Sequence, residues 1–516
     1  MRWAHRFAIL VAICLTFSFV AWFVPRALDP SKRDPEKRAR DRLWINTSPH
    51  FLDRQACQWF SICGIHHLRR DPAIRSEAPE WDDDEEWGEL RRRVSSWADG
   101  TETTTKRSIG QKRGTSERTR EVKEVPDYVL NHAPLVHLYS KEEFWPSDIR
   151  EHVEHMAVYS DGELVKESVL SLHSLSQLND YGKQVHLRSK DNVEDRPDWL
   201  YSHHNLPNPS QPHPEDEVPP RIVGDGQGKV IERDDTTWFD ADKDHPVHRI
   251  TEPRQNRQRP RHEHPEKQAK GHKPDADGYS KAPAVLVMVD KGSGIVDAFW
   301  FFFYSYNLGQ TVLGVRYGNH VGDWEHCLVR FEHGEPRGIF FSEHEGGQAY
   351  AWDAVEKLGS RPVIYSAVGS HAMYPLPGIH PYVLPFKMLK DVTDKGPLWD
   401  PALNNYAYHY DYTLDQVHRD DHTKDSSQTE ANGVPQSLVP AASNPDAPTS
   451  WFYYRGRWGD EVYSLADHRQ WRLFGQYHYV TGPDGPRFKT LNRRKICQSQ
   501  TKCKILRELD PKGTWY

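Results

Sequence analysis

The chain has 516 residues, of which only 37% are hydrophobic, and its mean hydropathy is −0.81. Together with 37 Pro and 33 Gly, this composition excludes a chain that is packed throughout, because such polar stretches cannot bury enough apolar surface. The formal net charge of −7 is mild and predicts no nucleic-acid partner.

The N-terminus carries an apolar run over residues 7–24, which Pro25 and Arg26 follow. The run is just long enough to cross a bilayer, and no obvious cleavage site follows it. We predict that residues 1–26 form an uncleaved signal anchor with its flank, which attaches the protein to a membrane; a cleaved signal peptide is the alternative. Residues 27–124 are charged and broken, so they predict a disordered stalk with short helices around residues 43–60 and 85–94.

Two features of the sequence predict different compartments for the part of the chain that follows the anchor, which is called the body below. Basic residues are more frequent after the apolar run than before it, which favours a cytosolic body. Two short-spaced cysteine pairs, Cys57 with Cys63 and Cys497 with Cys503, are typical of disulfides in an oxidising compartment. Asn46 begins a glycosylation triplet. The redox argument is the heavier one, so we predict a lumenal body on a membrane of the secretory or vacuolar pathway, with a cytosolic body as the alternative.

Residues 125–516 are predicted to form one domain. Polar, proline-rich insertions interrupt it at about residues 190–281 and 415–448, with one ordered island near residues 237–240. Residues 146–156 combine a helix entry with apolar residues at helical spacing, and so predict one amphipathic helix.

From residue 282 onward, short segments rich in Val, Ile, Phe, Tyr and Trp alternate with turn residues. This pattern predicts a mainly β fold, an antiparallel β-sandwich with a few short helices and long disordered insertions. The aromatic run in residues 299–306 predicts a central strand. No phosphate-binding glycine motif follows any strand, which argues against nucleotide binding.

A polar cluster, His320, Asp323 and Glu325, leads into the next strand pattern. Side chains alternate across a strand, so Asp323 and Glu325 are expected on one face and Trp324 on the other. Two carboxylates on one surface repel each other unless a cation or a proton lies among them, and the imidazole beside them adds a nitrogen ligand. The set therefore predicts a divalent-cation site for Mg or Ca, with Mn or Zn not excluded by ligand type. A hydrogen-bonded polar cluster at a sheet rim is the alternative.

Two later histidines, His344 and His371, follow strand-like segments next to glycines and could converge on the same cavity. Glu343 and Glu345 flank His344, and by alternation they are expected to be rim residues.

Several blocks of this sequence resemble the fungal vacuolar protein sorting-associated protein 62 family. The blocks are YVLNHAPLVHLYSKEEFWPSDI, YGNHVGDWEHCLVRF, SAVGSHAMYP, and GRWGD with TGPDGPRFKTLNRRKIC. The resemblance covers about residues 125–503 without the insertions. It implies a role in the delivery of proteins to the vacuole, with vacuolar cargo as a partner, and no established catalytic activity.

The chain is also similar to the necrosis- and ethylene-inducing-like proteins, β-sandwiches that hold a divalent cation at a GHRHDWE segment. The comparable residues 318–325 keep the His, Asp, Trp and Glu, and the segments carrying His344 and His371 look like that group's later histidine segments. An acidic ligand precedes the motif in that group, and the comparable position here is the neutral Asn307. Membrane-damaging activity is not carried over.

Three functions follow. The first is a non-enzymatic, membrane-anchored protein of vacuolar sorting whose cation binds a polar ligand such as a sugar or a lipid head group. The second is a metal-assisted hydrolase of a phosphoester or glycoside, with Glu325 or His371 as general base. The third is a structural cargo adaptor without a functional metal.

Overall fold

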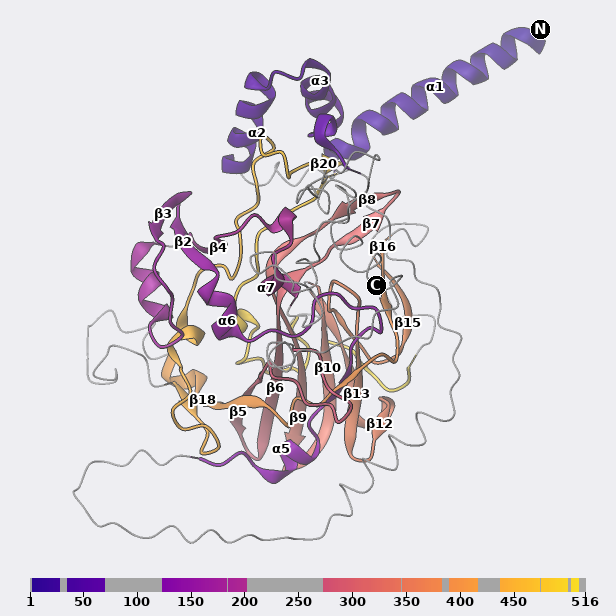
Figure 1. Ribbon diagram of the computed structural model, residues 1–516. Helices are drawn as coiled ribbons and strands as arrows, with labels where there is room; N and C mark the ends of the chain where they lie inside the picture. Colours follow the sequence, from indigo (N-terminus) through magenta and orange to yellow (C-terminus); the bar gives the residue numbers. More distant parts are fainter. Residues whose placement is uncertain are drawn as a thin grey trace, which may run out of the picture.

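The computed structural model describes residues 2–27, 35–69, 123–182, 184–201, 272–344, 346–382, 389–415, 437–473, 475–499 and 503–509. Its centre is an eight-stranded sheet with the strand order β19-β18-β5-β6-β9-β10-β11-β22 (Figure 1). The strands are β5 (Ala284–Gly292), β6 (Ile295–Asn307), β9 (His320–Glu332), β10 (Glu335–Glu343), β11 (Gly346–Ala351), β18 (Asn405–Tyr410), β19 (Leu438–Pro440) and β22 (Ile505–Leu506).

A second sheet packs on one face of the central sheet. It has the order β12-β13-β1-β17, with β14 also paired to β13. Its strands are β1 (Leu135–His137), β12 (Lys357–Leu358), β13 (Arg361–Ser366), β14 (Met373–Tyr374) and β17 (Leu398–Trp399). Most pairings in both sheets are antiparallel, but β5 with β18, β11 with β22 and β1 with β13 are parallel. The predicted mainly β sandwich is confirmed, with these parallel pairs as a difference.

Strand β6 is buried on both faces, and its side chains alternate between two cores. Phe299, Phe301 and Phe303 belong to a core beneath α6 (Ile149–Glu154) and a small sheet of β2 (Met156–Ser160), β3 (Glu163–Lys166) and β4 (Val185–Ser189). Trp300 and Phe302 belong to the core between the two main sheets. Burial on both faces explains why this strand is an almost unbroken aromatic run.

Smaller elements surround these layers. The strands are β7 (Gln310–Val312), β8 (Val315–Tyr317), β15 (Gly378–Tyr382), β16 (Leu389–Thr393), β20 (Arg472–Leu473) and β21 (Gln476–Tyr477). The helices are α5 (Asp127–Asn131) and α7 (Asp198–Tyr201). The 3₁₀ turns are η2 (Ile65–His67), η3 (Leu175–Tyr181), η4 (Val193–Asp195), η5 (Trp352–Ala354), η8 (Ser450–Tyr453) and η9 (Pro486–Phe488). Helix α6 begins where predicted, because the Asp148 side chain accepts a hydrogen bond from the Arg150 amide, but it is shorter than predicted.

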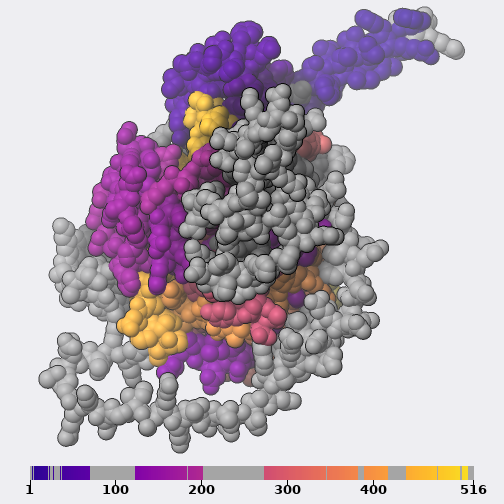
Figure 2. Space-filling model, in the orientation of Figure 1, coloured from indigo at the N-terminus to yellow at the C-terminus, as the bar shows by residue number. Residues whose placement is uncertain are grey.

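Residues 35–69 differ from the predicted disordered stalk. They form helices α2 (Pro35–Thr47) and α3 (Phe51–Phe60), which lie on the C-terminal segment (Figure 2). The Arg472 guanidinium explains this contact: it binds the Asp41 carboxylate, and it lies 3.3 Å from Cys63 Sγ. The helix predicted around residues 43–60 is therefore present as the end of α2 and as α3, whereas the one around residues 85–94 lies outside the described residues.

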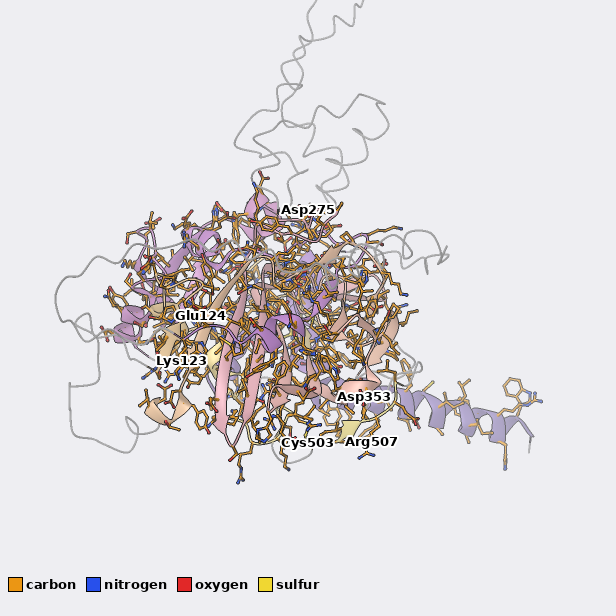
Figure 3. All side chains as sticks on the ribbon, turned by 90° about the horizontal axis from the view of Figure 1, so that it is seen from below. Lys123, Glu124, Asp275, Asp353, Cys503 and Arg507 are labelled. Atoms are coloured by element: carbon orange, nitrogen blue, oxygen red, sulfur yellow. A yellow bond between two sulfur atoms is a disulfide. The ribbon has the colours of Figure 1, made fainter. Side chains whose placement is uncertain are left out.

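Both predicted disulfides, Cys57–Cys63 and Cys497–Cys503, are formed. Figure 3 shows Cys503 near Arg507, at the end of the edge strand β22. Asn46 is exposed on α2, and its glycosylation stays a prediction.

The margins of the predicted insertions are ordered. His272 and Ser280 are buried in the first, where the Ser280 hydroxyl donates to the His272 carbonyl oxygen at 2.6 Å. Leu438 is buried in the second, where β19 pairs with β18. The polar middles, residues 202–271 and 416–436, lie outside the described residues, as does the island predicted near residues 237–240.

Helix α1 (Arg2–Ala27) projects from the body in both ribbon views (Figures 1 and 3). Over the stretches that the structure describes, no helix meets the length and hydropathy of a membrane span.

Candidate functional site

The predicted cluster lies on β9. Asp323 faces Tyr304 in the pairing with β6, and Glu325 faces Phe302. Trp324 points into the opposite core. The two carboxylates therefore share the face between the two sheets, as alternation predicts, and both are buried.

The start of β9 is shaped by Gly322. Its φ is 69°, and a Cβ there would lie 2.1 Å from the Trp458 carbonyl oxygen, so only glycine fits. His320 is partly buried, and its Nδ1 lies 2.7 Å from the Gly322 carbonyl oxygen. Burial lowers the pKa of His320, although the nearby Asp323 carboxylate acts in the opposite direction.

His371 comes from the turn between β13 and β14 and completes the central contact. Its Nδ1 lies 3.0 Å from Asp323 Oδ2, and its Nε2 lies 3.1 Å from the Phe144 carbonyl oxygen and 3.8 Å from Glu142 Oε1. Its ring stacks on Tyr304 with 3.7 Å between the ring centroids. The ring is thus clamped between two carboxylates and one aromatic face.

This clamp determines the charge of His371. Burial disfavours the charged ring, but the Asp323 and Glu142 carboxylates outweigh it and raise the pKa of His371 to about 9. His371 also has a φ of 56°, a conformation that costs free energy in a residue other than glycine. The surrounding contacts must hold it there.

Glu325 is held differently. The Ser342 hydroxyl on β10 donates a hydrogen bond to Glu325 Oε2. Burial and the neighbouring Asp323 charge raise the pKa of Glu325 to about 8, against the effect of Lys489. At neutral pH a proton on Glu325 and the charge of His371 therefore relieve the repulsion among the acids.

His344 meets a different carboxylate. Its Nε2 lies 2.7 Å from Asp391 Oδ2 on β16, and the hydroxyls of Ser370 and Tyr374 each donate to Asp391 at 2.7 Å. Burial disfavours a charged His344, but Asp391 raises its pKa to about 9. Sequence reasoning missed Asp391, Glu142, Ser342 and Lys489. An isolated aspartate within the strand-like LKDVT was the available signal for Asp391.

The sequence also singled out Glu343, Glu345 and Asn307. Glu343 is buried rather than at the rim, and burial raises its pKa well above the ordinary value. The prediction was wrong because β10 ends at Glu343 and His344 has a φ of 50°, so strand alternation no longer applies. Glu345 lies outside the described residues. Asn307 closes the loop before β9, since its Nδ2 donates to the Gly318 carbonyl oxygen at 2.9 Å.

The structure thus connects Asp323, Glu325 and His371 in one acid and imidazole network between the sheets, with His344 and Asp391 next to it. Among the residues that the structure describes, no three His, Cys, Asp or Glu side chains are grouped so that they could hold a metal ion. The cation site at His320, Asp323 and Glu325 stays a prediction.

The fold and this network define a mainly β sandwich with a buried acid and imidazole site. The family model of vacuolar protein sorting-associated protein 62 matches residues 291–383, which include most of the network. Two Saccharomyces cerevisiae proteins are similar over most of the chain. "Putative vacuolar protein sorting-associated protein TDA6" is 35% identical over 398 residues, which are 72% of this chain and 68% of that protein. Vacuolar protein sorting-associated protein 62 is 32% identical over 409 residues, with the same coverage.

The chain therefore belongs to the vacuolar protein sorting-associated protein 62 family. Among solved structures, Necrosis and Ethylene inducing Protein 2 from the causal agent of cocoa's Witches Broom disease is 19% identical, covers 19% of this chain and 46% of its own, and has a TM-score of 0.15. The non-toxic HaNLP3 protein is 18% identical, covers 23% and 51%, and has a TM-score of 0.16. This likeness is weak, and no argument about function rests on it.

Proposed function

We propose that this protein acts in the sorting of proteins to the vacuole, without catalysis, as a membrane-attached protein with a lumenal body. The observation that carries the proposal is the relationship to two yeast proteins named for vacuolar protein sorting, at 32–35% identity over 72% of this chain. Vacuolar cargo is the partner that this role requires.

The support for membrane attachment is the surface of α1. Phe7, Leu10, Leu15 and Phe17 are exposed on a helix that projects away from the body (Figure 2). Apolar side chains on an isolated helix are unfavourable in water, and a bilayer is the solvent in which they are stable.

The support for a lumenal body is the pair of disulfides, because disulfides persist in oxidising compartments. Cys327, the free cysteine of the sandwich, is buried and so protected from oxidation.

The experiment is a sorting assay in the cells that produce this protein. Deletion of its gene is expected to divert a vacuolar hydrolase into the medium, and the full chain is expected to restore delivery, whereas a chain without residues 2–27 is not. Unchanged delivery after deletion would exclude the proposed role.

A second proposal concerns a divalent cation, Mg²⁺ or Ca²⁺, at His320, Asp323 and Glu325. Nδ1 of His320 is occupied by the Gly322 carbonyl, which leaves Nε2 as the ring atom for a metal. Asp323 Oδ2 and Glu325 Oε2 are engaged by His371 and Ser342, so a cation would have to use the other oxygens or displace these partners. We therefore expect the cation to bind weakly. An open coordination position on the cation would accept an oxygen of a sugar or of a lipid head group.

Titration calorimetry on the full chain tests the cation proposal. Heat of binding with Ca²⁺ or Mg²⁺ is expected for the native chain and for Asp353→Asn, an exposed control, and not for Asp323→Asn. No heat with either ion, or equal heat in both variants, would reject the site.

The hydrolase alternative gains less support. Glu325 and His371, its proposed general bases, are buried and engaged in hydrogen bonds, so neither reaches a substrate without rearrangement. Turnover of phosphoester or glycoside substrates that Glu325→Ala abolishes would favour it. The adaptor alternative requires that metal has no effect on cargo binding.

A further inference from the structure

Exposed apolar side chains gather at the end of the molecule from which α1 leaves. Leu52 and Trp59 on α3 are 81% and 48% exposed, and Leu313 in the β7–β8 turn is 85% exposed. Figure 1 shows α3 at the base of α1, which it contacts, and the β7–β8 hairpin packs against residues 62–68, which follow α3. These three side chains are called the apolar end below.

Helix α3 is firmly attached, so the exposure of its outer side chains is not the result of a loose helix. Asp53 and Cys57 lie on its buried side. Asp53 Oδ1 accepts a hydrogen bond of 2.9 Å from the Gly64 amide, and Cys57 is bonded to Cys63. Leu52 and Trp59 are seven residues apart, which is two helical turns, and so they share one outward face.

Leucine is an energetically unfavourable residue at position 313 for two reasons. It has a φ of 53°, which a bulky residue rarely adopts, and its side chain is almost wholly in water. Leucine at this position therefore stabilises neither the turn nor the core. An apolar environment outside the protein would account for it.

The β7–β8 hairpin and the N-terminal segment form one packed unit. Val315, Tyr317, Trp471 and Leu473 share a core against which Ile62, Leu68 and Val312 pack. The tip of the hairpin is therefore held in a constant position relative to α3.

The short connection between α1 and α2 keeps this packed unit close to whatever holds α1. Between Ala27 and Pro35 the chain advances by eight residues, which span at most about 29 Å when fully extended. Helix α1 also contacts α3 directly. A bilayer that holds α1 must therefore lie near the apolar end.

We propose that the apolar end inserts into the surface of the bilayer that holds α1, so that the body lies on the membrane in one orientation. Tryptophan and leucine side chains favour the boundary between head groups and acyl chains. This inference depends on the proposed attachment of α1 to a membrane. It adds a contact between the folded body and lipid, in a region where the sequence predicted a disordered stalk.

The test uses the full chain with Cys14→Ser, reconstituted in phosphatidylcholine vesicles and labelled with an environment-sensitive dye at a single new cysteine. Leu52→Cys and Leu313→Cys probe the apolar end. Ser293→Cys is the matched control, because Ser293 is exposed in the β5–β6 turn with a φ of 54°. Ser293 precedes β6, whereas the β7–β8 hairpin follows the far end of that strand of 13 residues, which is about 40 Å long.

The dye at positions 52 and 313 is expected to shift to the blue and to be quenched at least twofold by lipids with a nitroxide on the acyl chain, whereas the dye at 293 is not. A blue shift without quenching would assign the surface to a protein partner or a second copy and overturn the proposal. Equal quenching at all three positions, or at none, would also overturn it. Flotation of the vesicles is measured in parallel: a chain that floats without quenching at 52 and 313 refutes only this inference, and a chain that does not float refutes the attachment of α1 as well.

Discussion

At the scale of single residues, the ring of His371 is fully buried and depends on two carboxylates for its charge. It is the buried cation between Asp323 and Glu142, and its removal leaves two carboxylates without that partner. Such uncompensated burial typically costs about 3–5 kcal/mol.

We therefore expect His371→Asn to lower the free energy of unfolding in urea by about 3 kcal/mol or more. Asparagine tolerates the left-handed backbone, so the loss reports the missing charged ring and its contacts rather than backbone strain. His468→Asn, at an exposed histidine, is expected to change stability by less than about 0.5 kcal/mol. Equal effects in the two variants would show that His371 contributes no special interaction.

Glu194 gives the protein a component of its stability that depends on pH. Burial disfavours its charge, but His478, at 3.5 Å, and the Tyr479 hydroxyl, at 2.6 Å, lower the pKa of Glu194 to about 2. Because the folded value lies below the ordinary value of 4.5, the stabilisation is complete above about pH 4.5 and is lost as the pH falls toward about 2.

Glu194→Gln is accordingly expected to be less stable than the native chain by about 3 kcal/mol at pH 7, with a difference that narrows below pH 4.5. Urea unfolding between pH 7 and pH 3.5 measures it, and Glu335→Gln, at an exposed strand position, is the control. A difference that stays constant over this range would contradict the assignment.

At the scale of secondary-structure elements, Arg472 holds the N-terminal helices on the body. It is buried, and it joins β20 to Asp41 on α2 and to Cys63 beyond α3. Backbone hydrogen bonds between Cys63 and Arg472 add to this contact.

In Arg472→Met, we expect the amides of α2 and α3 to exchange hydrogen about 10- to 100-fold faster, as befits the loss of about 1.4–3 kcal/mol of local stability. Amides of β6 and β9 are expected to stay protected. Arg455→Met, at an exposed arginine, is the control. Simultaneous loss of protection in β6 would mean that these helices unfold only with the whole molecule.

The elements that sequence reasoning predicted are those that local patterns determine. The aromatic alternation of β6 and the placement of Asp323 and Glu325 on one face of β9 follow from a period of two residues. The partners Glu142 and Asp391 escaped prediction because they come from distant segments, and no local pattern reports which strands meet. The packing of residues 35–69 on the body escaped for the same reason, since Arg472 lies more than 400 residues further along.

At the scale of the whole molecule, the described residues form a β-sandwich from which the apolar helix α1 projects. Two disulfides support the proposed lumenal body, and the exposed apolar side chains of α1 support its proposed attachment to a membrane. If this attachment holds, the proposed insertion of the apolar end would determine which side of the sandwich faces the bilayer.

Fractionation of sealed vesicles from the cells that produce this protein tests that arrangement most directly, with a tag at the C-terminus and protease added outside. The account predicts that the full chain stays with the membranes through alkaline carbonate and that the tag survives protease until detergent opens the vesicles. Release of the chain by carbonate, or digestion of the tag in intact vesicles, would contradict it.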